Sequence, residues 1–201
     1  MSFELTKLYF VRHAQPVFGH IDDLTRPLTD EGMNDTAAVL GFFKDKHIDA
    51  FISSPYKRSV DTILSTAEYF GKTIETDIRL REREKGQGGN THELIRKRWA
   101  DKSFCEEDGE SLLSVQKRNI EALSEILLKY KGKTVVIGTH GTALSTILNH
   151  YDNTFGYDDF MRIIDRMPYI VELDFDGEKL IEKNERLHIC KEFAPQDLTI
   201  R

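Results

Sequence analysis

The sequence predicts an α/β fold, a three-layer sandwich in which helices cover both faces of a largely parallel central sheet. Short apolar runs typical of buried strands alternate along the chain with amphipathic stretches typical of helices. The 201 residues are enough for one well-filled core and rather few for two. Because no repeat, low-complexity tract or linker divides the chain, we assign residues 1–201 to one domain.

Three short apolar runs predict buried strands, at residues 8–11, 50–53 and 134–138. Amphipathic segments after them predict helices. The first helix begins near Thr29, and Asp30 and Glu31 then suit the positive end of its dipole. Further helices are expected at residues 60–70, 112–130 and 143–148.

The last third of the chain contains a predicted hairpin. Residues 169–175 alternate roughly at period two and lead into Asp176-Gly177, which is a turn signal. A short strand around residues 179–181 completes the hairpin.

Residues 83–110 interrupt the alternation of strands and helices. The segment is glycine-rich at 86–89, highly charged and only weakly periodic. We therefore expect an excursion from the sheet that shapes substrate access, together with the loop at 16–26. The charged run at 79–85 is mixed in sign, and apart from Glu82 we interpret it as a solvated face.

Composition and charge exclude several classes of partner. The net charge is -6 and the pI is near 5.7, so no basic field attracts nucleic acid or an acidic membrane. No apolar run approaches the roughly 20 residues that span a bilayer, and residues 1–7 do not resemble a secretory signal. Cys105 and Cys190 form no C-x-x-C pattern, and the histidines show no metal-ligand spacing. We expect reduced thiols, a cytoplasmic location and no metal.

Unusual polar residues follow each of the three predicted strands. Arg12 and His13 follow the first, Arg58 lies in the first helical turn after the second, and His140 and Gly141 follow the third. In an open α/β sheet, ligands bind at the carboxyl ends of the strands. The sequence therefore predicts that two arginines and two histidines meet in one crevice.

This set of side chains suits a tetrahedral phosphoryl group. Arginine forks bind two phosphoryl oxygens at once, and backbone N–H groups near Gly141 and Thr142 add donors at a helix start. His13 can attack phosphorus, while His140 hydrogen-bonds the transferring oxygens. Neighbouring guanidinium charges should lower the pKa of His13 and keep it neutral. Glu82 is the candidate general acid for the departing alkoxide.

The ordered motifs resemble those of the histidine phosphatase superfamily, also called the phosphoglycerate mutase-like family. The matching segments run in the family's order over residues 8–148: Arg12-His13-Ala14-Gln15, Pro27-Leu28-Thr29-Asp30-Glu31-Gly32, Ser53-Ser54-Pro55 with Arg58, Leu80-Arg81-Glu82, Gly109-Glu110-Ser111 with Arg118, and Gly138-Thr139-His140-Gly141. The resemblance implies the phosphoglycerate mutase-like fold, a phosphohistidine intermediate on His13 and an acid at Glu82.

Three positions depart from the family pattern. Ala14 and Gln15 replace glycine and glutamate, and Gly19 stands where many members have an asparagine that contacts phosphate. Gln15 could supply the missing donor. Glu84 lies two residues beyond Glu82, so two glutamates compete for the role of acid, and we favour Glu82.

The predicted function is hydrolysis of a small-molecule phosphomonoester through phosphorylated His13, with no metal and no cofactor. Arg12, Gln15, Arg58, His140 and Gly141 are the predicted substrate-binding residues. The alternative is a cofactor-dependent phosphoglycerate mutase, although Glu82-Arg83-Glu84-Lys85-Gly86 lacks the tyrosine of the mutase motif. A third possibility is a non-catalytic phosphate- or protein-binding module. The sequence identifies neither the leaving group nor the oligomeric state.

Overall fold

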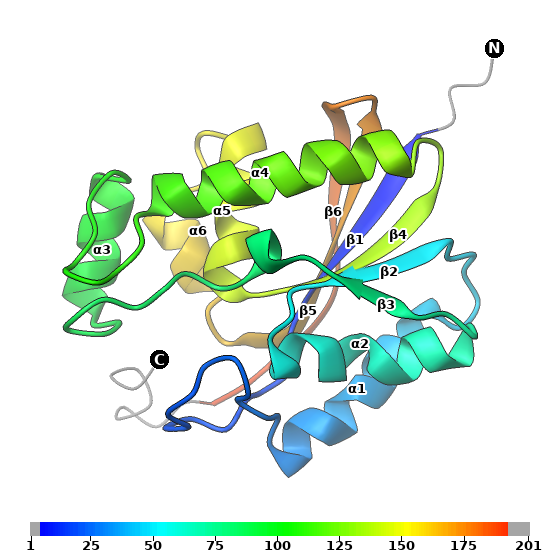
Figure 1. The fold of residues 1–201 in the computed structure, drawn as a ribbon, viewed down its shortest axis with the longest axis horizontal. Helices are drawn as coiled ribbons and strands as arrows, with labels where there is room; N and C mark the ends of the chain where they lie inside the picture. The colour runs from blue at the N-terminus through cyan, green and yellow to red at the C-terminus, as the bar shows by residue number, and fades with distance from the viewer. Residues whose placement is uncertain (1–4, 193–201) are drawn as a thin grey trace.

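A six-stranded sheet in the order β3-β2-β4-β1-β5-β6 forms the centre of the computed structural model, which describes residues 5–192 (Figure 1). Four strands are mutually parallel: β1 (Thr6–Arg12), β2 (Ala50–Ser53), β3 (Ile74–Thr76) and β4 (Thr134–Thr139). The predicted largely parallel sheet is therefore confirmed.

Two antiparallel strands extend the sheet beyond β1. β5 (Arg166–Asp176) is antiparallel to β1, and β6 (Lys179–Cys190) is antiparallel to β5. The predicted hairpin is present, but its second strand has 12 residues and not the three expected. β6 is an edge strand with mostly exposed side chains, and it is held in the sheet by its backbone pairing with β5. Its sequence therefore has little of the apolar alternation from which a strand is predicted.

Side chains of β1 enter a core on each face of the sheet. Leu8 and Phe10 face one core, and Tyr9 and Val11 face the other. Helices α4 (Leu112–Lys129) and α5 (Gly141–Tyr151) cover the first face, whereas α1 (Asp30–Phe43) and α2 (Lys57–Tyr69) cover the second. The three-layer α/β sandwich is confirmed.

The start of α1 is fixed as its sequence predicts. The Thr29 hydroxyl accepts a hydrogen bond from the Gly32 N–H at 2.9 Å, and acidic residues occupy the first turn.

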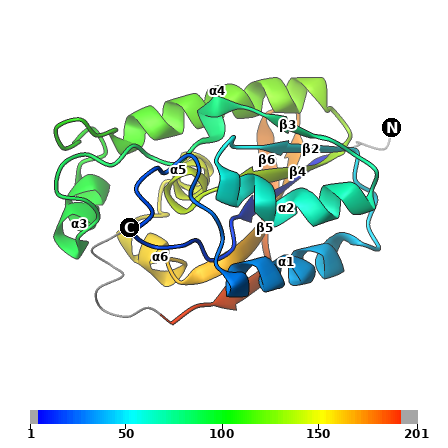
Figure 2. The ribbon, with the colours of Figure 1, turned by 60° about the horizontal axis from the view of Figure 1, so that its bottom comes forward.

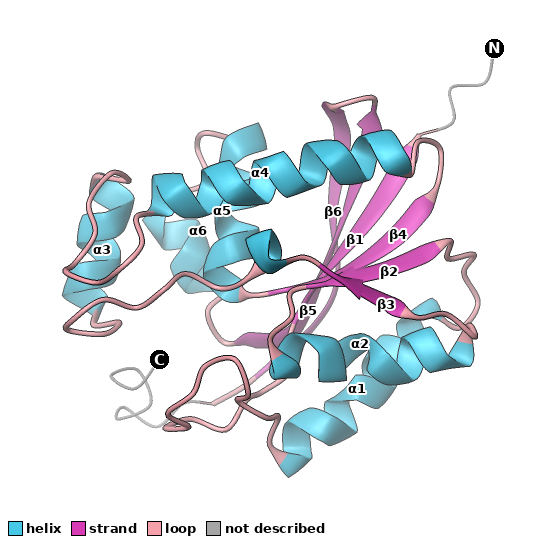
Figure 3. Ribbon diagram, in the orientation of Figure 1, coloured by secondary structure: helices cyan, strands magenta, loops and turns pink. Residues whose placement is uncertain are grey.

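The segment at 83–110 leaves the sheet, as predicted, but it contains the unpredicted helix α3 (His92–Ala100). The short elements η1 (Ile78–Leu80) and α6 (Tyr157–Arg162) were also not predicted. Trp99 of α3 packs on Phe155 and Phe160, with ring centroids 6.1 and 5.9 Å apart. Figures 2 and 3 show α3 and α6 at the same end of the molecule as the long loop after β1.

Candidate active site

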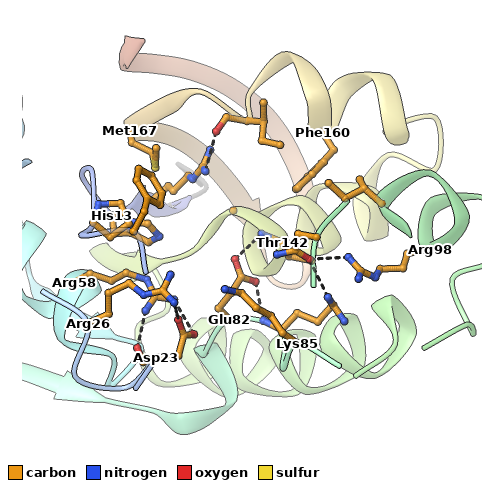
Figure 4. Close-up of a pocket in the computed structure, with 18 of the residues that line it drawn as sticks. His13, Asp23, Arg26, Arg58, Glu82, Lys85, Arg98, Thr142, Phe160 and Met167 are labelled. Carbon is orange, nitrogen blue, oxygen red and sulfur yellow. Dashed lines mark hydrogen bonds and ion pairs between the residues drawn. The ribbon is translucent and has the colours of Figure 1, made fainter. Parts of the chain in front are cut away.

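The carboxyl ends of β1, β4 and β2 meet at one edge of the sheet. Arg12 is in register with Thr139, and Ser53 with Gly138, so the residues that follow these strands lie side by side. A cavity opens at this edge (Figure 4). Five of the predicted site residues line it: Arg12, His13, Arg58, Glu82 and Gly141.

His13 is held in one tautomer. Its Nδ1 lies 2.7 Å from the carbonyl oxygen of Ala14. Because a carbonyl can only accept, Nδ1 carries the proton and Nε2 keeps a lone pair. Burial, followed by the charges of Arg58 and Arg12, holds the pKa of His13 well below its usual 6.5. The predicted direction of the pKa shift is confirmed, although burial outweighs the guanidinium charges, and the ring is neutral at physiological pH.

His140 is fully buried behind His13, and the ring centroids are 5.3 Å apart. Its Nε2 lies 2.8 Å from Oγ of Ser54, while its Nδ1 has no hydrogen-bond partner among residues 5–192. Burial and the charge of Arg58 hold the pKa of His140 well below its usual value. The ring is therefore neutral and can donate one hydrogen bond if Ser54 donates to the other nitrogen.

Arg12 is 7% exposed, and the protein fixes both its terminal nitrogens. Nη1 donates to the carbonyl of Ile163 at 2.6 Å, and Nη2 donates to that of Ile164 at 3.0 Å. Gly141 packs directly against this guanidinium, since a Cβ at position 141 would lie 3.2 Å from Arg12 Cζ. Burial lowers the pKa of Arg12 to about 10, so it stays charged at neutral pH.

Arg58 is equally constrained. Its Nη1 donates to the carbonyl of Asp23 at 2.7 Å, and its Nη2 donates to the carboxylate of Asp23 at 3.1 Å. In the described chain, the Nε atoms of Arg58 and Arg12 have no hydrogen-bond partner. The terminal nitrogens of both arginines are thus oriented by protein acceptors, and their buried Nε atoms are donors that this part of the chain leaves without an acceptor.

Glu82 lies at the N-terminus of α5. Its Oε2 accepts the N–H of Thr142 at 3.0 Å, and its Oε1 accepts those of Arg83 and Ala143 at 2.7 and 3.3 Å. This corrects the expectation that the Thr142 N–H serves a substrate anion, because the helix start already binds a carboxylate of the protein. Glu84 pairs with Arg81 at 3.1 Å, is 57% exposed and is not part of the cavity lining.

Arg118 of α4 fixes the backbone that carries Glu82. It donates to the carbonyls of Arg79, Arg81 and Glu82 at 2.6, 2.7 and 3.1 Å. The carboxylate of Glu110 holds Arg118 in turn, with contacts of 2.7 and 2.8 Å. Glu110 and Arg118 belonged to the matching motifs, but only the structure shows what they hold.

Gln15 lies outside the cavity lining and at the start of α1. Its Oε1 accepts from the Thr29 hydroxyl at 3.1 Å, and its carbonyl accepts the Thr29 N–H at 3.0 Å. Gln15 thereby ties the loop after β1 to α1. Its predicted contact with substrate stays a prediction.

Four further cations line the cavity, and none of them was predicted from the sequence to belong to the site: Arg26, Arg83, Lys85 and Arg98. The interpretation of residues 79–85 as a solvated face is wrong for Arg83, which is only 4% exposed. Arg83 and Arg98 share the buried carboxylate of Glu106, at 3.4 and 2.7 Å, and both donate to Asn90. The sequence around these residues has no periodic pattern that would predict their burial. Their burial depends on partners elsewhere in the excursion, which compensate the buried charges.

Residues 5–192 contain no group of three or more histidine, cysteine, aspartate or glutamate side chains that could hold a metal ion. Nor does this part of the chain contain a helix long and apolar enough to cross a membrane. Cys105 and Cys190 are exposed free thiols.

The fold places this chain among the α/β proteins with a cationic cavity at the carboxyl edge of a largely parallel sheet, and comparison with known families identifies the family. The family model of the histidine phosphatase superfamily (branch 1) matches residues 8–183. The chain belongs to this family.

Relatives include both phosphatases and a mutase. Phosphoserine phosphatase 1 of Hydrogenobacter thermophilus is 29% identical over 150 residues, which cover 68% of this chain and 71% of that protein. A mycobacterial glucosyl-3-phosphoglycerate phosphatase superposes with a TM-score of 0.73 at 19% identity, over 90% of this chain and 97% of that one. A phosphoglycerate mutase from Bacillus anthracis str. Sterne superposes with a TM-score of 0.67 at 16% identity. The match covers 88% of this chain and 91% of that one. Both structures share the fold, and the fold alone does not decide between hydrolase and mutase.

Proposed function

We propose that this protein is a phosphatase that hydrolyses phosphomonoesters through a phosphohistidine intermediate on His13. One observation carries the proposal: a neutral imidazole with its lone pair on Nε2 lines the same cavity as the buried guanidinium groups of Arg12 and Arg58. The name of the relative from Hydrogenobacter thermophilus supports hydrolysis over mutase activity.

In the first step, Nε2 of His13 attacks phosphorus and forms a P–N bond while the ester P–O bond breaks. Arg12, Arg58 and Nδ1 of His140 donate to the equatorial oxygens, where charge develops. Gly141 permits this arrangement because its missing side chain leaves room for the Arg12 guanidinium.

Glu82 gives its proton to the leaving alkoxide, which departs as an alcohol. Without ligand, its carboxyl accepts three backbone N–H groups. A phosphoryl dianion bound nearby would repel a carboxylate and favour the protonated acid. In the second step, water attacks phosphorus, its proton passes to Glu82, and the P–N bond breaks to release inorganic phosphate.

Arginines and histidines supply the positive charge in this mechanism, so we propose that it needs no metal and no cofactor. The two exposed free thiols support a reducing, cytoplasmic location.

Replacing His13 tests the function. His13→Ala should abolish turnover of 4-nitrophenyl phosphate and the acid-labile phosphoprotein trapped from the unmutated enzyme. His47→Ala is the matched control, since this histidine is 84% exposed and pairs only with Asp49 at 3.2 Å. Full activity of the His13→Ala protein would refute the nucleophile, and strong inhibition by a chelator would refute the metal-free mechanism.

The mutase alternative requires that the phosphoryl group return to a second hydroxyl. A coupled assay that interconverts 2- and 3-phosphoglycerate measures this activity. We expect release of inorganic phosphate to exceed interconversion at every concentration of phosphoglycerate.

A further inference from the structure

Arg26 is not used by the proposed phosphoryl chemistry, although it lines the same cavity as Arg12 and Arg58. It comes from the loop between β1 and α1 and is only 7% exposed. Its Nη2 donates to the carbonyl of His20 at 3.4 Å and lies 2.9 Å from the carboxylate of Asp23. Protein oxygens therefore hold Arg26 by a terminal nitrogen, as they hold the two phosphoryl-binding arginines.

Three buried Nε atoms in this cavity lack an acceptor. They belong to Arg12, Arg26 and Arg58, and none of the three has a hydrogen-bond partner within residues 5–192. By contrast, Nε of the buried Arg98 and Nε of the buried Arg118 each donate to a glutamate, at 2.9 and 2.7 Å. Because buried donors are normally paired, the three Nε atoms indicate an acceptor that the protein itself does not supply.

The carboxylate of Asp23 holds Arg26 beside Arg58, and Figure 4 shows the two side chains next to each other. One carboxylate oxygen lies 2.9 Å from Nη2 of Arg26, and the other lies 3.1 Å from Nη2 of Arg58. Arg26 is also close to the nucleophile. Burial is the largest cause of the lowered pKa of His13, and the charges of Arg58, Arg12 and Arg26 add to it. The Arg26 guanidinium therefore lies at the phosphoryl end of the cavity.

The charge balance at this end of the cavity depends on Arg26. Asp23 and Glu82 line the cavity and supply two carboxylates before a substrate binds. These carboxylates offset the charges of Arg12 and Arg58, so the two arginines alone would leave no net charge to attract a phosphoryl dianion. With Arg26, the sum over these five groups is positive.

We propose that Arg26 is a third phosphoryl-binding arginine, which donates from Nε to the same phosphoryl group as Arg12 and Arg58. The inference rests on the proposed phosphatase function and adds to it a residue from the loop before α1. A guanidinium in this place stabilises the equatorial oxygens on which negative charge develops. Because the contact is made to the phosphoryl group itself, its effect is the same for every leaving group.

Binding of inorganic phosphate tests the contact without any leaving group. Charge-assisted hydrogen bonds are strong, so Arg26→Gln should raise the Kd of phosphate, measured by calorimetry, about 10- to 100-fold, or about 1.4–2.8 kcal/mol. Arg26→Lys keeps the charge but loses the planar fork, and it should weaken binding at least about threefold, which serves as the test if the glutamine variant does not fold. Unchanged phosphate affinity in the folded Arg26 variants would overturn the proposal.

Arg186→Gln is the matched control. It removes an arginine that pairs with Glu172 on β6, outside the cavity lining, and it should leave the Kd of phosphate unchanged.

A double-mutant cycle separates a direct contact from an effect passed through Asp23 to Arg58. In the Arg58→Gln protein, Arg26→Gln should still raise the Kd of phosphate, because Arg26 makes its own contact. No further loss of affinity in this background would mean that Arg26 only positions Arg58, and the direct contact would be refuted.

Turnover distinguishes a contact with the phosphoryl group from one with the leaving group. Arg26→Gln should lower kcat/KM for 4-nitrophenyl phosphate and for glycerol 3-phosphate by factors that agree within about threefold. A loss confined to one substrate would place Arg26 at the leaving group and overturn the proposal. Weaker phosphate binding by the Arg26 variants supports the contact even if no phosphomonoester is hydrolysed. Conversely, turnover with an unchanged Kd of phosphate refutes the contact and leaves the phosphatase function standing.

Discussion

Replacing Arg118 by methionine would show whether the backbone that carries Glu82 must be held for catalysis. Arg118 donates to the carbonyls of Arg79, Arg81 and Glu82 and to both oxygens of Glu110, at 2.6–3.1 Å. Methionine fills much of the same volume but donates no hydrogen bond. The variant therefore releases the Glu82 backbone without opening a large void.

The expected loss of stability follows from burial. Arg118 is 9% exposed, and breaking a buried ion pair by removing one partner costs about 3–5 kcal/mol. Arg81 lies 3.7 Å from Glu110 and can partly replace the lost charge, so we expect a value near the lower limit, about 3 kcal/mol. For a domain of this size, Tm should fall by roughly 6–12 °C.

The expected loss of activity depends on the leaving group. General acid catalysis typically raises a rate about 10²–10⁴-fold. If Glu82 is no longer held in place, kcat for an alkyl phosphate should therefore fall at least about tenfold. 4-Nitrophenyl phosphate, whose leaving group departs without a proton, should lose less than about threefold. Steady-state rates for both substrates, measured well below Tm, give the ratio.

Arg186→Met is the matched control, since Arg186 pairs with Glu172 at 2.6 Å on β6, outside the cavity lining. This variant should leave the ratio of the two rates unchanged. If Arg118→Met slows both substrates equally, Arg118 acts on the fold as a whole and its positioning role is refuted. Full activity of Arg118→Met on the alkyl phosphate would refute that role as well.

Two other predictions test the acid and the histidines. Glu82→Gln should slow alkyl phosphate hydrolysis about 10²–10⁴-fold, whereas Glu84→Gln should change it less than about threefold; the reverse order would make Glu84 the acid. Because the folded pKa values of His13 and His140 lie below 6.5, the unfolded chain binds more protons in acid. Below about pH 6.5, the free energy of unfolding should therefore decrease, by up to about 1.4 kcal/mol per pH unit for each histidine. A free energy of unfolding from urea denaturation that does not change with pH would contradict this.

Local patterns were enough to predict three of the four parallel strands, β1, β2 and β4, and the main helices that follow them, but not the short edge strand β3. The runs at 8–11 and 135–137 have no charged residue and only one polar group, the Tyr9 hydroxyl, because both faces of β1 and β4 are covered, so their prediction as strands is unambiguous. Thr29 marked the start of α1 because a capping hydroxyl acts within three residues. Position in the chain also predicted that Arg12, His13, Arg58 and His140 come together, since each lies at the end of a strand or near the start of the helix that follows it.

Other elements left no such signal. β6 is held by backbone pairing along an edge, so its side chains are free to be polar. Helix α3 is short, and one of its two buried residues, Arg98, is charged, so its sequence shows no clear apolar face. Arg98 is buried because Glu106, eight residues further on, and Asn90, eight residues before it, surround its guanidinium. Such pairings depend on the path of the loop and not on periodicity.

The charged residues of the cavity divide in the same way into those that local sequence patterns predict and those that only long-range contacts bring together. The groups predicted to bind a phosphoryl unit are set by the ends of β1, β2 and β4, and short motifs reveal them. The other charged residues of the cavity lining come from the loop before α1 and the excursion before α4, and they meet only through long-range contacts such as that of Asp23 with Arg58. Asp23 belongs to both sets, because one of its oxygens orients a phosphoryl arginine while the other holds Arg26. A change in the loop before α1 that moves Asp23 should therefore also disturb Arg58, because the carboxylate of Asp23 accepts a hydrogen bond from its Nη2.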